Sequence, residues 1–111
     1  MRFGPWLPLD RAAELAPARP GLLQARGDAL LPLPAGKSAM VLYAASDEDQ
    51  GLDQLVRDRA APALRRAAEL GACWIRFGET GQPARELARL LGDFKERFGA
   101  PPPANRDEPG A

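Results

Sequence analysis

The stretch Ser38-Ala39-Met40-Val41-Leu42-Tyr43-Ala44-Ala45 decides the fold of this 111-residue chain. Its apolar character is continuous instead of alternating, which is typical of a strand buried on both faces of a sheet. We therefore place a strand over residues 38–45 and assign the other elements outward from it.

Upstream of this strand, prolines and glycines divide the sequence. Residues 21–26 predict a short strand that ends at a Gly-Asp turn. Residues 29–37 contain Pro32 and Pro34, and proline cannot donate a hydrogen bond to a sheet. These residues are therefore not expected to form a central strand.

Downstream, the apolar spacing changes to that of helices. Leucines recur at helical spacing over residues 52–70, and Pro62 is expected to begin a second helical segment there. Residues 72–77 predict a third strand. The clearest helix covers residues 83–98 and ends at Gly99.

The order β-β-α-β-α predicts a small single α/β domain with a three-stranded sheet flanked by helices. We place this domain at residues 17–105. Residues 1–16 are expected to form an N-terminal extension with one short helix, which Pro17 ends. Residues 106–111 are expected to form a disordered tail.

The apolar positions of the predicted strands and of the last helix are expected to form one core. Cys73 lies in the third predicted strand and is expected to be a buried structural thiol. The expected core residues are Met40, Leu42, Ile75, Leu87, Leu91 and Phe94.

Composition excludes several classes of function. The chain has no histidine, which removes the Ser-His-Asp triad, the Cys-His dyad and any imidazole metal ligand. One cysteine cannot form an internal disulfide or a cysteine-rich zinc site. The 15 basic and 15 acidic residues cancel, which argues against strong nonspecific binding of nucleic acid. No apolar run reaches the length of a membrane span or a signal peptide, so a cytoplasmic location and no membrane partner are expected. The bias toward Arg, Ala, Pro and Gly is typical of a GC-rich, bacterial-like coding sequence.

Two charged segments and one glycine motif leave alternatives open. The sequence Ala35-Gly36-Lys37-Ser38 ends like a phosphate-binding loop, but Leu31 replaces the first glycine and a strand follows instead of a helix. No nucleotide cofactor is therefore expected. Residues 47–49 form a solvated acidic loop or a site for a hard cation. The arginines of the following helix face either phosphates or their own acidic neighbours; they are Arg57, Arg59, Arg65 and Arg66.

The order of these pieces resembles the GIY-YIG nuclease superfamily over residues 17–105. The matching pieces are Pro20-Gly21-Leu22-Leu23, Leu42-Tyr43-Ala44-Ala45, an Arg-bearing helix, a strand ending Phe77-Gly78-Glu79-Thr80, a helix with Glu86, and Pro103-Ala104-Asn105. The resemblance implies a small sheet flanked by helices, in which members hydrolyse DNA with one divalent metal.

The resemblance also implies roles for individual residues. The catalytic positions would be Tyr43, Arg57 or Arg59, and Asn105, and Glu86 would be the metal ligand unless another register places Leu90 there. Leu23 replaces the first motif tyrosine, and Ala45 replaces the glycine of the second motif.

Loss of a tyrosine, and of the carboxylate ligand in the register that places Leu90 there, weakens both metal binding and water activation. The leading hypothesis is a diverged, non-catalytic GIY-YIG-like domain that acts as an accessory module binding DNA or another protein. The alternative is a DNA endonuclease that depends on Mg²⁺ or Mn²⁺. A third hypothesis is a small structural protein that associates through exposed apolar surface near Trp6 and the proline-rich loop. The oligomeric state is left open.

Overall fold

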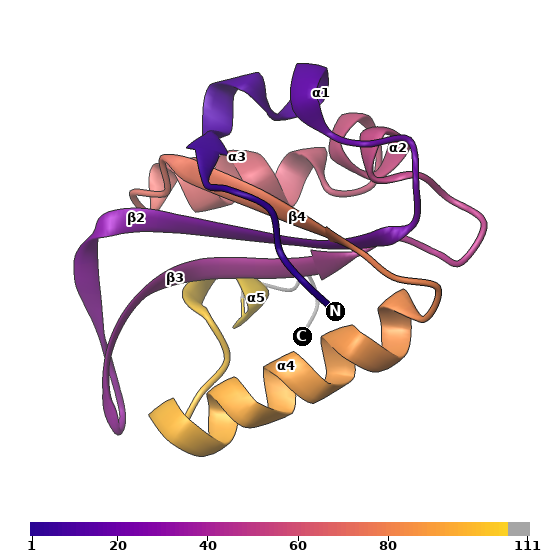
Figure 1. Cartoon of the computed structure of the whole chain (residues 1–111). Coiled ribbons are helices and arrows are strands. Elements are labelled where there is room, and N and C mark those ends of the chain that lie inside the picture. Colours follow the sequence, from indigo (N-terminus) through magenta and orange to yellow (C-terminus); the bar gives the residue numbers. More distant parts are fainter. Residues whose placement is uncertain (107–111) are drawn as a thin grey trace.

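An antiparallel sheet with strand order β1-β4-β2-β3 organises the computed structural model, which describes residues 1–106 (Figure 1). Strands β2 (Gly21–Leu33) and β3 (Gly36–Ala45) form a long hairpin, and β4 (Trp74–Glu79) pairs with the other side of β2. The fourth strand, β1 (Leu7–Pro8), pairs with β4. The expectation of three strands was wrong because β1 has only two residues and carries no alternating pattern.

The proline-rich residues extend the hairpin beyond the centre of the sheet. Strand β2 pairs with β4 only as far as Arg26, whereas its pairing with β3 continues to Leu33. Pro32 therefore lies in a part of β2 that has one neighbouring strand and one open side, where a missing N–H leaves no ladder bond unmade.

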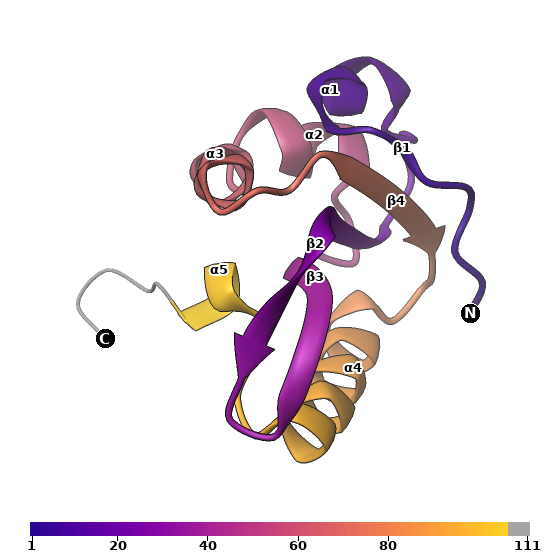
Figure 2. The same cartoon turned by 90° about the vertical axis from the view of Figure 1, so that its left-hand side faces the viewer.

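Helices cover both faces of the sheet (Figures 1 and 2). One face carries α1 (Ala12–Leu15), which follows the 3-10 turn η1 (Leu9–Arg11), together with α2 (Leu52–Arg57) and α3 (Ala61–Glu69). The long helix α4 (Pro83–Phe98) covers the other face. The short helix α5 (Pro103–Arg106) lies beside β3.

Local signals in the sequence fix the ends of the helices. Pro62 lies in the first turn of α3, and Gly99 ends α4 with φ of 84°, as predicted. Arg106, expected in the tail, is the last residue of α5. The rest of the expected tail, residues 107–111, lies outside the described residues.

The main core lies between the sheet and α2 and α3. Leu42, Ile75 and Phe94 are buried as predicted. The other three expected core residues, Met40, Leu87 and Leu91, are only half-buried. Leu87 and Leu91 lie on α4, the long helix of this face, and Leu87 borders an open cavity next to β3, so side chains at the margin of the contact between helix and sheet keep part of their surface in solvent.

Cys73 is exposed, so the prediction of a buried thiol was wrong. Strand β4 begins one residue later, at Trp74, so Cys73 lies in the connection that precedes it. Across residues 1–106, no helix has the length and apolar character needed to cross a bilayer.

Candidate binding site at the edge of strand β3

A cavity of about 220 Å³ opens at the outer edge of β3, between α2, α3, α4 and α5. Three of the residues to which the family resemblance gives roles, Tyr43, Arg59 and Asn105, line the cavity. Most of the remaining lining is apolar: Leu42, Ala44, Ala45, Leu55, Ala60, Ala63, Leu87 and Ala104.

The Asn105 side chain closes the exposed edge of β3. Its Oδ1 accepts a hydrogen bond of 2.8 Å from the Tyr43 backbone N–H, and its Nδ2 donates one of 2.8 Å to the Tyr43 carbonyl. This pair of bonds reproduces what a neighbouring strand would make with the same residue. Both polar atoms of the Asn105 amide are therefore used to complete the sheet.

Replacing Asn105 by alanine should lower the free energy of unfolding by about 1–3 kcal/mol, because the N–H and C=O of Tyr43 lose their partners. The open edge should also favour self-association. Urea unfolding and sedimentation would measure the two effects. The exposed neighbour provides the control, since Arg106→Ala should change stability by less than about 0.5 kcal/mol. Equal stability of the two variants would contradict the edge-closing role.

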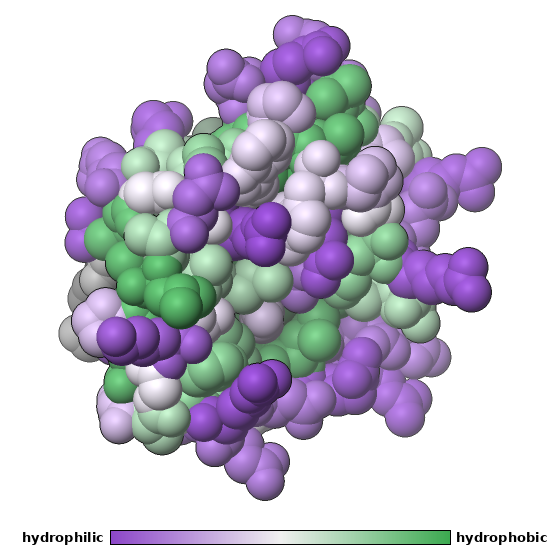
Figure 3. All heavy atoms as spheres, turned by 60° about the vertical axis from the view of Figure 1, so that its left-hand side comes forward, coloured by the Kyte–Doolittle hydropathy of each residue, from purple (hydrophilic) through white to green (hydrophobic). Residues whose placement is uncertain are grey.

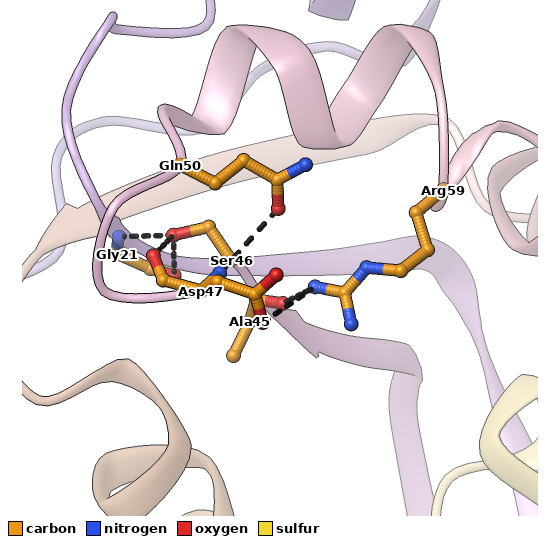
Figure 4. A network of polar contacts seen from close by, with 6 residues as sticks. All are labelled: Gly21, Ala45, Ser46, Asp47, Gln50 and Arg59. Atoms are coloured by element: carbon orange, nitrogen blue, oxygen red, sulfur yellow. Dashed lines mark hydrogen bonds and ion pairs between the residues drawn. The ribbon is translucent and has the colours of Figure 1, made fainter.

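Arg59 closes the next position along the same edge. Its Nη2 donates a hydrogen bond of 2.6 Å to the Ala45 carbonyl and lies 4.0 Å from the Asp47 carboxylate (Figure 4). The acidic loop is fixed at its start by Ser46, whose hydroxyl accepts a 2.9 Å bond from the Gly21 N–H. Arg59 is therefore engaged by the chain's own carbonyl and carboxylate groups.

Arg57, the other candidate for the helix arginine, does not line this cavity. It ends α2 and forms an ion pair of 3.1 Å with Asp53, one turn earlier on the same helix. Its environment is that of a solvated helix face. Of the two alternatives, the structure places Arg59 at the edge of β3.

Glu86 lies in the first turn of α4 and is also outside the cavity lining, to which Leu87 contributes instead. Arg89 donates two hydrogen bonds, of 3.2 and 2.9 Å, to Glu86 Oε2. These bonds lower the pKa of the Glu86 carboxyl below its ordinary value. Leu90, the other candidate for this position, borders a depression formed with Phe94 and the C-terminal half of α4.

These residues do not fit a divalent-metal site as they are arranged. The single candidate carboxylate is held by an arginine. Over residues 1–106, no three His, Cys, Asp or Glu side chains meet where they could hold a metal ion. Hard divalent cations are normally bound by several oxygen ligands.

Tyr43 faces α4, with its ring edge-on to Phe94 at a centroid distance of 5.7 Å. Burial raises the pKa of its hydroxyl above the ordinary 10.0, and the charge of Arg76 partly offsets this effect. Leu23 is fully buried and pairs with Ala44, the residue after Tyr43. Because neighbouring residues of a strand face opposite sides of the sheet, the two motif positions lie on opposite faces.

A pH titration should show this raised pKa directly. Tyr43 is the only tyrosine in the chain, so phenolate absorbance reports on it alone. The folded protein should ionise above pH 10.0, the ordinary value that the unfolded chain should show. The stability that the buried neutral phenol contributes is complete below the unfolded pKa and is lost as pH rises through the folded pKa. Tyr43→Phe should abolish this alkaline loss of stability, whereas an ionisation that is the same with and without urea would contradict the burial of the hydroxyl.

The sequence analysis did not single out a second group of polar side chains. Gln24, Arg26 and Arg76 occupy polar positions within the otherwise buried parts of β2 and β4. In the sequence, these polar residues alternate with apolar residues that are buried in the structure. The alternation does not show that the three side chains are neighbours, because the pairing of β2 with β4 cannot be read from the sequence.

Comparison with protein-family models, with curated proteins and with solved structures finds no match to this chain.

Proposed function

We propose that this chain is a GIY-YIG-like accessory domain without hydrolytic activity, which binds a partner protein at the edge of β3. The observation that carries the proposal is the use of the site's polar groups. Asn105 and Arg59 bond to the backbone of β3, and Glu86 bonds to Arg89. The order of a hairpin, two helices, a strand and a long helix supports the family assignment.

The size and lining of the β3-edge cavity favour a protein partner. Its volume of about 220 Å³ is below the roughly 300–1,000 Å³ of pockets that enclose small ligands. It suits one or two apolar side chains of a partner, and its lining is predominantly apolar.

The charge beside the cavity favours a basic partner segment over a nucleic acid. Asp47, Glu48 and Asp49 are all exposed, and Asp47 lies against Arg59 at the cavity wall. Exposed carboxylates attract lysine and arginine and repel phosphates. The expected ligand is therefore a segment with an apolar residue next to basic residues.

The apolar surface does not favour the third hypothesis, a protein that associates through a broad hydrophobic face. Among residues 1–106, the exposed large hydrophobic side chains are Met1 and Leu30. Hydrophilic side chains separate the apolar patches on the side drawn in Figure 3. Trp6 itself is half-buried.

Selection from a displayed library of random peptides would test the proposal. The full chain should enrich peptides that combine an apolar residue with Lys or Arg. Ala63→Trp, which fills the cavity, should weaken their binding about tenfold or more. Ala88→Trp, on an exposed position of α4 outside the cavity lining, should leave binding unchanged.

A second pair of variants tests the charge argument. Reversal of two exposed acids of the loop, Glu48→Lys with Asp49→Lys, should weaken the same peptides. Reversal of Glu96, an exposed acid on α4, should have little effect. Enrichment of acidic peptides, or equal binding by the Ala63→Trp variant, would overturn the proposal.

The alternative endonuclease is tested by plasmid nicking. We expect no cleavage of plasmid or single-stranded DNA with Mg²⁺ or Mn²⁺, because Leu23 offers no hydroxyl and Arg89 holds Glu86. Nicking that Glu86→Ala abolishes would establish the alternative. Nicking that persists in that variant would identify a contaminating nuclease.

A further inference from the structure

Two arginines and a tryptophan form a cluster on the face of the sheet that α4 partly covers. Gln24 pairs with Tyr43 on one side and with Arg76 on the other, which places these three side chains on the same face. Arg26 follows two residues after Gln24 on β2 and therefore shares that face. The guanidinium carbons of Arg26 and Arg76 lie 4.7 and 4.4 Å from the centre of the Trp6 ring.

The N-terminal segment brings the tryptophan to this position. It runs back along β4 (Figure 1), held by a hydrogen bond of 2.8 Å from the Gly4 N–H to the Phe77 carbonyl and by the pairing of Leu7 with Ile75. Phe3 covers Arg76 as well, at 4.7 Å from the guanidinium carbon to the ring centre. The cluster is thus fixed by backbone pairing and not by the side chains alone.

Within the described part of the chain, no carboxylate forms an ion pair with either arginine. Neither Arg26 nor Arg76 forms an ion pair within residues 1–106, whereas arginines on the helices pair with neighbouring acids. Asp28 is turned to other partners, the Trp74 indole N–H at 2.9 Å and the Cys73 thiol at 3.6 Å. The two half-buried guanidinium groups therefore lie close together without a counterion among the described residues.

The hydrogen bonding of the cluster is also incomplete. Arg26 Nε is buried without a partner, the one such side-chain atom among the described residues. Arg76 Nε donates a bond of 2.6 Å to Gln24 Oε1. The terminal nitrogens of both guanidinium groups make no hydrogen bond to residues 1–106 and contact solvent. Burial and the neighbouring charge of Arg26 lower the pKa of Arg76, while Tyr43 acts in the opposite direction.

We propose that Arg26, Arg76 and Trp6 form a binding site for a phosphate group. A guanidinium fork matches the oxygens of a phosphate, and an anion there would neutralise two adjacent charges that the protein leaves unpaired. The competing explanation is that the cluster only holds the N-terminal segment in place. One arginine on the indole ring would be enough for that, and no buried donor would be left without a partner.

The phosphate can belong to inorganic phosphate or to a phosphodiester of single-stranded nucleic acid, because both present the same oxygens. None of its three residues lines the cavity at the edge of β3, so the site does not depend on the proposed protein partner. An NMR titration of the ¹⁵N-labelled full chain at constant ionic strength tests the phosphate site. The titration follows the arginine Nε–H and tryptophan indole N–H signals. Sodium phosphate replaces sodium chloride in one series, and a short oligonucleotide is added in the other.

Phosphate should produce saturable shifts at Arg26, Arg76 and Trp6, with half-saturation at about 1 mM or below. Arg65, an exposed arginine on α3, should not shift. The variants Arg26→Gln and Arg76→Gln should weaken binding about tenfold or more, and Arg65→Gln should bind as the parent does. Arg76→Lys keeps the positive charge but removes the two parallel donors of the guanidinium group, so it should also bind phosphate more weakly. The test therefore does not depend on the folding of one variant.

The two series also distinguish the source of the phosphate. An oligonucleotide that binds more tightly than phosphate, with affinity that falls as salt rises, assigns the site to nucleic acid. An oligonucleotide that binds no more tightly assigns it to a free phosphate group. Absent or non-saturating shifts, or equal shifts at Arg65, would overturn the proposal and leave the cluster as a structural clasp.

Discussion

Gly21→Ala should destabilise the protein by about 3 kcal/mol or more, because a side chain has no room where β2 begins. A Cβ atom on Gly21 would overlap the Gly78 carbonyl oxygen of the neighbouring strand. It would also lie 3.0 Å from Leu52 Cδ1, which is part of the main core. The clash can be relieved only by separating β2 from β4, which breaks their hydrogen bonds.

Thermal unfolding would measure this effect, and the shift in Tm should be about 10 °C or more for a domain of this size. Gly81→Ala is the matched control, since a Cβ there meets no atom within 4 Å. Similar Tm values for the two variants would contradict the close approach of β2 and β4 at this point. The same contact gives a structural reason for the glycine in the stretch Gly21-Leu22-Leu23.

Ile75→Ala should lower the free energy of unfolding by about 2–5 kcal/mol, as in other fully buried large-to-small changes. Ile75, the second residue of β4, is completely buried. Leu91→Ala should cost about 1–2 kcal/mol, because Leu91 is only half-buried on α4 and loses less apolar area.

Urea unfolding of both variants under the same conditions would test the order of these effects. A larger loss for Leu91→Ala than for Ile75→Ala would mean that the main core lies under α4. An exposed alanine of the same helix gives the baseline, since Ala84→Gly changes helix propensity by only about 1 kcal/mol.

Elements with strong local signals were predictable from the sequence. The apolar run at residues 38–45 lies in β3, and Pro62 and Gly99 mark helix ends that depend on the chemistry of single residues. Strand β1 was not predictable, because it has only two residues and is defined by its pairing with β4, which is distant in sequence. The burial of Leu91 was overestimated for a similar reason, since periodicity shows which side of a helix is apolar but not how much material covers it.

The family resemblance brought Tyr43, Arg57 or Arg59, Asn105 and Glu86 into one hypothesis. Three of them, Tyr43, Arg59 and Asn105, line one cavity, and Arg57 and Glu86 do not. Their hydrogen bonds were not predictable, because the side-chain amide of Asn105 can bind a ligand or bond to the backbone of a neighbouring strand, and the sequence does not distinguish the two. The cluster of Arg26 and Arg76 could not be predicted from the sequence for a different reason. The two residues are distant in sequence, and only the register of β2 against β4 makes them neighbours.

The bonds from Asn105 to Tyr43 connect residues 62 positions apart, which has a consequence for protein synthesis. At about 5–20 residues per second, the ribosome needs roughly 3–12 s to add the residues between them. During this interval, any β2–β3 hairpin that forms on the nascent chain lacks the asparagine and the final helix that cover its outer edge. Neighbouring ribosomes on one message hold such hairpins close together. The period of greatest risk for edge-to-edge aggregation is therefore set by translation speed, and slower translation of the last third of the chain would lengthen it.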